Sequence, residues 1–496
     1  MGIEFMRITY LFFLPLLLWT SISAYSPFRN FNSTVAVNDV AIINQTVWVA
    51  SKGGLARVQK GSREISLPTT NVPFGDVKLT ALAPDKKGGM WIGTANGTLY
   101  YYRNGILESF NSYRSASWDI RDLSLHGDIL LVSSSVGVSL FDVQKKAAVA
   151  NATAFQGIGP ITNCARIHGD TLYVGLSNGY AKTAVDTASV REKNFFDETI
   201  WSVEERDEGV KQLLVHQGRV KDYAHITVLD GSTEYYADSA TIYKNGNKIL
   251  SLPSTITALT LDSDGTLWCG TSDDYFYSIS GSKAQQYRIP GMYFSNVSRV
   301  AVGAKGRTWF IPRIAVPNTP WWQGVVSYDG SHWELYNKHT VGDFRELGDG
   351  TEFMGISRGH QGDMWFGANG EGLRKYNTET DQWSRYFVGV LHLDSFKVFK
   401  PGEHFWNKSD AVASDSSGYL WAAAYDCYEG KLVCYDSRAA VPTDDDYIRI
   451  SEASDQKFVS INVDQAGRVF AGSTDGQLLI ITHDGSPLDG VTPYVT

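Results

Sequence analysis

Short apolar stretches separated by Gly- and Asp-rich turns recur along the chain from residue 35 onward. Residues 257–261 (Thr-Ala-Leu-Thr-Leu) show the usual form, in which apolar and polar side chains alternate with a period of two. That period, with turn residues at both ends, predicts β-strands rather than helices. The strands come in groups of four, and the second strand is centred on Trp while the third is aromatic. We therefore predict an all-β protein built from repeated four-stranded units.

The second strand of each unit carries the most recognisable phrase. It reads Gly-Met-Trp-Ile-Gly-Thr at residues 89–94, Thr-Leu-Trp-Cys-Gly-Thr at 266–271 and Asp-Met-Trp-Phe-Gly at 363–367. With weaker copies included, the centres lie about 40 to 56 residues apart, which is typical of β-propeller blades. Residues 200–250 look like one degenerate copy, and the total is about ten blades. We expect the repeated Trp to pack between neighbouring blades as core, where a large flat side chain fills the wedge-shaped gap.

About ten blades can form one large ring or two smaller rings in tandem. The last copy supplies three strands, at residues 459–463, 469–473 and 478–482, and residues 25–32 resemble a fourth. Pairing these two ends would close a ring and remove an exposed sheet edge. We therefore favour a single ring over 25–496, closed by the N-terminal strand, and keep two tandem rings as the alternative.

The N-terminus has the order of a secretory signal peptide. Arg7 precedes an apolar run at residues 8–19, and small residues follow up to Ala24. We predict that residues 1–24 are a signal peptide, and no later stretch is long and apolar enough to predict a membrane span. The net charge of −9 argues against a nucleic-acid partner, because nothing neutralises a phosphate backbone. The expected location is the periplasm or the cell surface.

The four cysteines and the acidic turns give few signals of a cofactor. Cys427 and Cys434 flank a turn between two strand-like runs, so we predict a disulfide across that hairpin. Cys164 and Cys269 lie in apolar strand patterns and are expected to be buried. No spacing suggests a zinc site, and the Asp-rich segments 262–265 and 444–446 give only a weak hint of calcium. We predict no cofactor.

The phrase D-x-x-G-x-L-W-I-G-T followed by G-L-x-R-Y resembles the two-component-regulator propeller repeat. It is matched best at residues 85–102, 262–277 and 362–376, and weaker similarity extends over most of 35–485. The resemblance implies periplasmic sensor propellers that bind glycan fragments, and similar repeats occur in surface propellers associated with type IX secretion. The chain lacks the kinase and DNA-binding parts of a sensor, so a complete sensor kinase is not expected.

Four insertions are predicted to leave one face of consecutive blades. Residues 312–323 and 425–430 join second and third strands, and residues 338–351 and 388–409 link blades, so all four emerge on the same side of a meandering propeller. The residues there that suit recognition of a glycan or a protein are Arg313, Trp321, Trp322, Asp343, Arg345, Glu346, His392, His404, Trp406 and Asp426. An alternative is that Trp321 and Trp322 fold back to cover the insertion's own small core.

Two functions follow from this pattern. The first is a non-catalytic binding or scaffold protein of the periplasm or cell surface, whose partner is an envelope protein or a glycan. The second is a carbohydrate-active enzyme, a lyase or glycosidase, that uses the same face. No spacing of carboxylates fixes a general acid and base, and no nucleophile elbow, zinc-protease motif or phosphate loop occurs. We therefore favour the non-catalytic function.

Overall fold

The structure is a computed structural model of the 496-residue chain. It describes residues 33–68, 78–111, 113, 118–186, 193–294, 297–312, 324–337, 340–341, 352–369, 372–386, 408–425, 430–438, 447–450 and 457–495. Within these residues the strands form eleven antiparallel sheets, ten of four strands and one of two. Each sheet is a meander of consecutive strands, as expected for propeller blades. The all-β prediction is confirmed.

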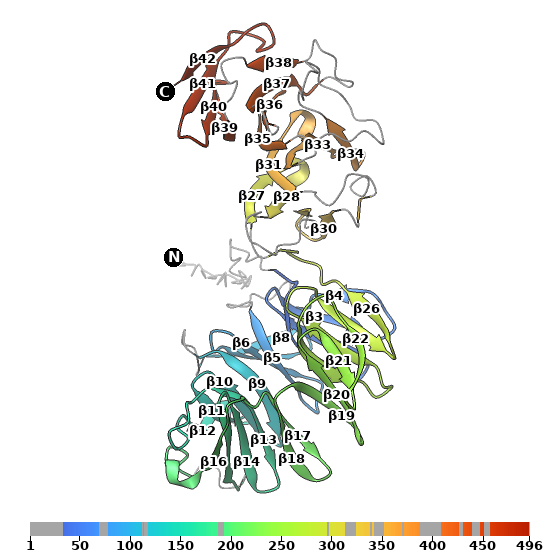
Figure 1. Ribbon diagram of the computed structural model, residues 1–496, viewed down its shortest axis with the longest axis vertical. Helices are drawn as coiled ribbons and strands as arrows, with labels where there is room; N and C mark the ends of the chain where they lie inside the picture. The colour runs from blue at the N-terminus through green and yellow to red at the C-terminus, as the bar shows by residue number, and fades with distance from the viewer. Residues whose placement is uncertain are drawn as a thin grey trace, which may run out of the picture. The chain divides into compact units, whose positions relative to one another are not determined.

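The first seven sheets comprise the strands from blue to yellow-green in Figure 1. Sheet 1 is β1 (Val37–Ile43), β2 (Thr46–Ser51), β3 (Gly54–Gln59) and β4 (Ile65–Ser66), and sheet 2 is β5 (Leu79–Pro84), β6 (Met90–Thr94), β7 (Leu99–Arg103) and β8 (Ile106–Phe110). Sheet 3 is β9 (Ile120–His126), β10 (Ile129–Ser134), β11 (Gly137–Asp142) and β12 (Ala147–Ala152), and sheet 4 is β13 (Thr162–His168), β14 (Thr171–Leu176), β15 (Gly179–Ala184) and β16 (Ser202–Glu205). Sheet 5 is β17 (Gln212–His216) and β18 (Arg219–Tyr223), and sheet 6 is β19 (Ile226–Asp230), β20 (Thr233–Asp238), β21 (Thr241–Lys244) and β22 (Asn247–Ser251). Sheet 7 is β23 (Ile256–Leu261), β24 (Leu267–Thr271), β25 (Phe276–Ser280) and β26 (Lys283–Tyr287).

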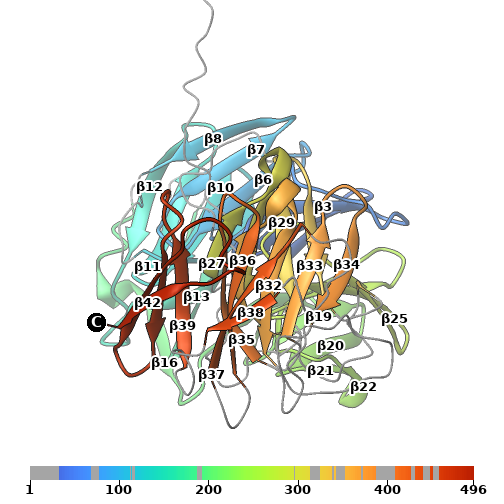
Figure 2. The same ribbon diagram turned by 90° about the horizontal axis from the view of Figure 1, so that it is seen from above.

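The last four sheets run from yellow to red in Figure 2. Sheet 8 is β27 (Val297–Val302), β28 (Thr308–Pro312), β29 (Val325–Tyr328) and β30 (Trp333–Tyr336), and sheet 9 is β31 (Glu352–Arg358), β32 (Met364–Asn369), β33 (Gly372–Asn377) and β34 (Gln382–Tyr386). Sheet 10 is β35 (Lys408–Ser414), β36 (Tyr419–Tyr425), β37 (Gly430–Asp436) and β38 (Tyr447–Ile450), and sheet 11 is β39 (Phe458–Val463), β40 (Val469–Ser473), β41 (Leu478–Thr482) and β42 (Thr492–Val495). Single 3-10 turns lie at Glu198–Ile200, Ala304–Gly306 and His360–Gly362. In the part of the chain that the structure describes, no helix is long and apolar enough to cross a lipid bilayer.

The Asp and Gly of the repeated phrase form the turn between the first and second strands. In sheet 2 the carboxylate Oδ1 of Asp85 accepts the N–H groups of Lys87 at 2.8 Å and Gly89 at 2.7 Å. Gly88 has φ +80°, a left-handed conformation that a side chain disfavours. Asp415 and Asp464 accept backbone N–H groups in the same way in sheets 10 and 11. The repeat is therefore a local turn signal, because the Asp satisfies backbone donors that the tight turn leaves free.

In the six described sheets that carry it, the repeated Trp packs the sheet against the next one, as predicted. Trp91 of sheet 2 lies in one core cluster with Ile120 and Leu123 of sheet 3, and Trp421 of sheet 10 lies in another with Phe458 of sheet 11. The Trp residues at this position are at most 7% exposed, and they are Trp48, Trp91, Trp268, Trp309, Trp365 and Trp421. These side chains are core, so they are not surfaces for ligands.

Sheets 1 to 7 form a closed ring. Inner strands pack side by side in chain order, and β1 of sheet 1 packs against β23 of sheet 7. Val37 and Val40 share a core cluster with Trp268 and Phe276 of sheet 7. The ends are also joined by a parallel bridge between Ser33 and Met292.

This closed ring of seven sheets differs from the prediction of a single ring of about ten blades. The ring ends at sheet 7, and sheets 8 to 11 continue separately, with β27 packed on β31, β31 on β35 and β35 on β39. Residues 200–250 contain two blades rather than one degenerate copy, because β17–β18 and β19–β22 are separate sheets. The count rises to eleven because sheets 5 and 6 lack the Trp phrase that makes a blade visible in the sequence.

Sheet 11 has a fourth strand from the C-terminal segment of the chain. Sheet 11 obtains its fourth strand from β42, whose Thr492 pairs with Thr482 of β41. Residues 25–32 lie outside the described residues, and the chain from Ser33 runs along sheet 7 instead. Pro493 lies in β42, and an edge strand tolerates Pro because its outer side needs no N–H donor.

The closure predicts a strong effect of a methyl group at Gly270. A Cβ at this position would lie 2.4 Å from Cγ1 of Val37, so sheet 1 must shift to admit it. Gly270→Ala should lower the free energy of unfolding by about 1–3 kcal/mol through overpacking. Urea unfolding followed by circular dichroism measures it. Gly159→Ala is the control, because nothing lies within 4 Å of a Cβ there, and equal effects of the two substitutions would contradict the closure.

Candidate functional site

All ten residues of the predicted binding face lie outside the described residues: Arg313, Trp321, Trp322, Asp343, Arg345, Glu346, His392, His404, Trp406 and Asp426. The structure does describe the strands that begin and end these segments. Residues 313–323 separate β28 from β29, and residues 426–429 separate β36 from β37. Both are connections between the second and third strands of a sheet. The other two segments, between β30 and β31 and between β34 and β35, are links from a fourth strand to the next first strand.

The topology brings all four segments to one end of three consecutive sheets. In an antiparallel meander the second-to-third connection and the link to the next sheet leave from the same end. Sheets 8, 9 and 10 are consecutive and packed against one another through β27, β31 and β35. This end of sheets 8 to 10 is called the loop end below. It is the candidate functional site.

Arg299 is a charged residue at the loop end that sequence reasoning missed. It lies in β27, next to a bulge that shifts the register between Val297 and Arg299. Its Nε donates to the carbonyl of Met354 in β31 and its Nη2 to the carbonyl of Val459 in β39, both at 3.3 Å. The side chain is exposed. A guanidinium held by two inner strands suits a carboxylate, a phosphate or a sugar hydroxyl. The sequence feature that could have revealed Arg299 is a cation within an otherwise apolar inner strand.

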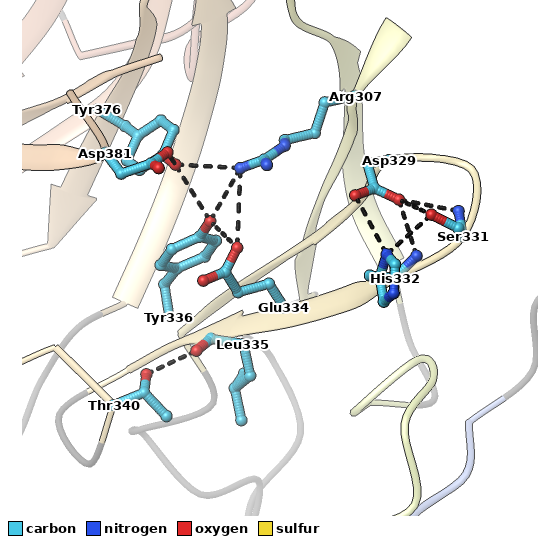
Figure 3. A network of polar contacts seen from close by, with 10 residues as sticks. All are labelled: Arg307, Asp329, Ser331, His332, Glu334, Leu335, Tyr336, Thr340, Tyr376 and Asp381. Atoms are coloured by element: carbon cyan, nitrogen blue, oxygen red, sulfur yellow. Dashed lines mark hydrogen bonds and ion pairs between the residues drawn. The ribbon is translucent and has the colours of Figure 1, made fainter. Parts of the chain in front are cut away.

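The opposite end of sheets 8 and 9 is held by a polar network around Arg307 (Figure 3). Its Nη1 donates to the hydroxyl of Tyr336 at 3.2 Å and to the hydroxyl of Tyr376 at 3.0 Å. The Tyr336 hydroxyl donates to Oε2 of Glu334 at 2.6 Å, and that oxygen lies 3.7 Å from Nη1 of Arg307. The Tyr376 hydroxyl donates to Asp381. Because Arg307 and Tyr336 belong to sheet 8 and Tyr376 to sheet 9, the network joins the two sheets.

The electrostatics of this network are those of a structural brace. Burial raises the pKa of Tyr336 well above its usual value, and the hydrogen bond to Glu334 raises it further. Burial and the bond to Asp381 raise the pKa of Tyr376 in the same way. Burial disfavours the charge of Arg307, but the two tyrosines and Glu334 outweigh it and raise its pKa. Both phenols therefore stay protonated at neutral pH, and the network fixes the two sheets that bear the first loops.

A second charged cluster lies on the inner strands of the closed ring. Nη1 of Arg166 in β13 is 2.6 Å from Oδ2 of Asp122 in β9. Asp39 of β1 accepts the N–H of Leu82 at 2.7 Å and the N–H of Val40 at 2.8 Å. Burial raises the pKa of Asp39 to about 7, the Leu82 N–H opposes the rise, and the charge of Asp122 adds to it.

Asp39 should make the stability of the ring depend on pH. A raised pKa means that the folded protein binds the proton more tightly than the unfolded chain, so the contribution is complete below pH 4 and is lost as pH rises through 7. The free energy of unfolding should fall by about 2–3 kcal/mol between pH 5 and pH 8 because of this group. Asp39→Asn should flatten that part of the profile. Urea midpoints at both pH values test it, and an unchanged slope in the variant would contradict it.

The cysteines and the acidic turn occupy structural positions. Cys164 and Cys269 are free and buried as predicted, and burial raises the pKa of Cys269 to about 12. Cys434 is also free and buried, and its register places it opposite Trp421 within the strand pair. No disulfide occurs among the described residues, and Cys427, the predicted partner of Cys434, lies outside them. Asp262 of the calcium candidate forms an ion pair with Lys60. The second calcium candidate, residues 444–446, is outside the described residues.

The described side chains offer little for catalysis. Within the ranges given above, no group of three or more His, Cys, Asp or Glu residues could hold a metal ion. The carboxylates of the Arg307 network and of the Asp39 cluster are engaged by N–H or O–H donors. The described part of the loop end is a set of packed sheets from which four connections leave, and it includes the exposed cation of Arg299. Such a frame is suited to binding.

The packed four-stranded meanders define a β-propeller protein. Residues 251–273 match the family model described as two component regulator propeller, which confirms the resemblance seen in the sequence. PorZ, a surface component of the type-IX secretion system of Porphyromonas gingivalis, is similar over 94% of this chain and 75% of its own, at 14% identity and a TM-score of 0.56. The extracellular domain of BT4673 from B. thetaiotaomicron is similar over 95% and 73%, at 14% identity and a TM-score of 0.38. The likeness to PorZ shows the propeller fold alone. A search of curated protein sequences gave no match.

Proposed function

We propose that this protein is an exported, non-catalytic β-propeller that binds an envelope protein or a glycan through the loop end. One observation carries the proposal: four connections leave three consecutive, tightly packed sheets at the same end. Long connections on a rigid propeller are where binding residues concentrate. The location proposed is the periplasm or the cell surface, which suits the N-terminal signal pattern and the solved structures of similar fold.

Three features support binding rather than catalysis. Arg299 is an exposed cation at the loop end, from which the segments that contain Trp321, Trp322 and Trp406 leave. Aromatic faces and a guanidinium are a common combination for sugars and for protein hot spots. The brace around Arg307 keeps sheets 8 and 9 fixed, so the loops start from a preorganised base.

The test is a matched pair of variants in a binding assay. Trp321→Ala with Trp322→Ala should weaken binding to the captured envelope protein or glycan by about tenfold or more, as hot-spot aromatics do. His332→Ala is the control, because His332 is exposed and lies at the other end of sheet 8. Envelope extract and a polysaccharide panel supply the ligands. Unchanged capture by the folded Trp variant would overturn the site, and new reducing ends in the panel would establish the enzyme instead.

A further inference from the structure

Sheet 5 is shorter than every other sheet that the structure describes. It consists of β17 and β18, whereas the other ten sheets have four strands each. Sheet 5 still holds a blade position in the ring. Leu213 belongs to a core cluster against which Tyr180 of sheet 4 and Val220 pack. On the other side, Oε1 of Gln212 accepts the N–H of Thr227 in sheet 6. No described strand therefore fills the third and fourth positions of this blade, between sheets 4 and 6.

The outer edge of β18 presents unpaired backbone groups. The residues that flank the two-residue turn Gln217–Gly218 pair with each other, and hydrogen-bonded pairs recur at every second residue from there. The carbonyl of Tyr223 accordingly faces β17, where it accepts the N–H of Lys211 at 2.9 Å. The N–H and C=O groups of Val220 and Asp222 then point away from β17, and among the described residues none of them has a hydrogen-bond partner. Another extended main chain matches such a row of donors and acceptors.

The face of sheet 6 toward this blade is less covered than its counterparts. Tyr236 and Tyr243 pair across β20 and β21, on the face opposite to the one that packs on sheet 7, and both are partly exposed. Tyr236 follows Tyr235, which holds the position of the repeated Trp. In the other four-stranded sheets the residue after that position and its third-strand partner are at most 7% exposed. In sheet 2, for example, Tyr100 is buried in a cluster with Leu55, a third-strand residue of the sheet before.

The stacking of these tyrosines favours a strand over a sugar as the occupant. The ring centroids of Tyr236 and Tyr243 are 4.9 Å apart with the planes at 11°, and His225 stacks on Tyr236 at 5.6 Å. Both neighbours cover ring faces of Tyr236, so the stack presents mainly ring edges toward sheet 5. A sugar stacks on a ring face, whereas apolar side chains pack well against ring edges.

We propose that the edge of β18 binds an extended segment of another protein, which adds as the third strand of sheet 5. Its main chain pairs with Val220 and Asp222, and its apolar side chains, at every second position, cover Tyr236 and Tyr243. The side chains between them face sheet 4, where Arg206 is already paired with Asp222, so polar residues suit these positions. The partner is thus a segment of alternating apolar and polar residues. This site belongs to the seven-sheet ring, whereas the loop end belongs to sheets 8 to 10.

A labelled peptide of residues 274–281, which contains the third strand of sheet 7, is the probe. It should bind the full chain saturably in fluorescence polarisation, with a dissociation constant below about 100 μM. Val220→Pro should weaken binding by about tenfold or more, because it removes an outward N–H that the hairpin itself does not use. Ala284→Pro is the matched control, since Ala284 holds the same place after a two-residue turn, on the outer edge of the complete sheet 7. Tyr243→Ala, which leaves β18 intact, should also weaken binding, and all three variants should keep the wild-type circular dichroism.

Hydrogen exchange of the wild-type protein locates the bound peptide. In the free protein the amides of Val220 and Asp222 should exchange faster than those of Lys221 and Tyr223, and the peptide should protect the first two. Mass spectrometry with electron-transfer fragmentation resolves these amides. The proposal is wrong if the peptide does not bind, if it protects another edge instead, or if both amides already exchange slowly in the free protein. Binding that neither Val220→Pro nor Tyr243→Ala weakens would overturn it as well. None of these outcomes bears on ligand capture at the loop end.

Discussion

Lys60→Met should lower the free energy of unfolding by about 3–5 kcal/mol at neutral pH, the usual cost of leaving a buried charge without its partner. Lys60 follows β3 in sheet 1, and its Nζ pairs with Oδ2 of Asp262 at the turn after β23 in sheet 7. The side chains are 10% and 2% exposed. The pair therefore lies at the junction that closes the ring, where water cannot replace the lost ammonium.

The pH dependence of this variant distinguishes a lost ion pair from lost packing. Burial alone would raise the pKa of Asp262, but the bonds from Lys60 and Ser263 lower it below its usual value. In the wild type the stabilisation is therefore present above pH 4 and is lost as pH falls through the lower folded-state pKa. In Lys60→Met burial dominates, so the variant should regain part of its stability as Asp262 becomes protonated in acid. Chemical unfolding at pH 4.5 and pH 7.5 measures both quantities.

Two further variants sharpen the experiment. Adding Asp262→Asn to Lys60→Met should recover much of the loss, because no unpaired charge then remains. Lys146→Met is the matched control, since Lys146 pairs with Glu108 where the side chains are 54% and 41% exposed. It should cost at most about 1 kcal/mol. A similar cost for both single variants, without recovery in acid, would show that the ring does not close through Lys60 and Asp262.

Trp309→Ala is expected to destabilise sheets 8 and 9 by about 3–5 kcal/mol, as removal of a buried Trp usually does. The indole is 0% exposed and lies against four aromatic rings. Ring centroids are 4.9 Å away for Tyr376, 5.3 Å for Tyr336 and 5.5 Å for Phe366, and Trp383 is the fourth neighbour. The substitution leaves a cavity in the core that joins the two sheets.

Trp309→Phe is the informative control. The indole N–H of Trp309 has no hydrogen-bond partner among the described residues. Replacing the indole with a phenyl ring therefore removes packing volume but no hydrogen bond. Its cost should be well below that of Ala, about 1–2 kcal/mol. Thermal unfolding by circular dichroism gives the comparison. Because the Arg307 brace includes Tyr336 and Tyr376, Trp309→Ala should also weaken ligand capture at the loop end, although it lies away from the loops.

Much of the fold could be predicted from the sequence because its signals are local. The Asp of each first turn binds backbone groups within four residues, as Asp85 does with Gly89. A short stretch of sequence is therefore enough to recognise the turn. The Trp of each second strand is large and periodic. Sheets 5 and 6 lack that Trp, and their strands were counted as one copy. Ring closure could not be predicted, because the bridge between Ser33 and Met292 has no counterpart in the local pattern.

The candidate site could also be predicted only in part from the sequence. That four connections share one end follows from the strand order alone, and the topology agrees with it. The residues within those connections stay predictions. Arg299 was missed because its importance comes from three inner strands that meet in space. The Arg307 brace was missed for the same reason, since Tyr336 and Tyr376 come from different sheets.

The closure of the seven-sheet ring has a consequence for how the chain folds during synthesis. Most junctions join sheets that are neighbours in the sequence, but Thr34 bonds to the carbonyl of Ile289, 255 residues later. At about 5–20 residues per second, a ribosome needs on the order of ten to fifty seconds to make the intervening chain. The valines of β1 lack their partners for that whole period. Sheet 1, although made first, is therefore the last sheet of the ring to be completed, and its valines stay without the sheet 7 side of their core until sheet 7 exists.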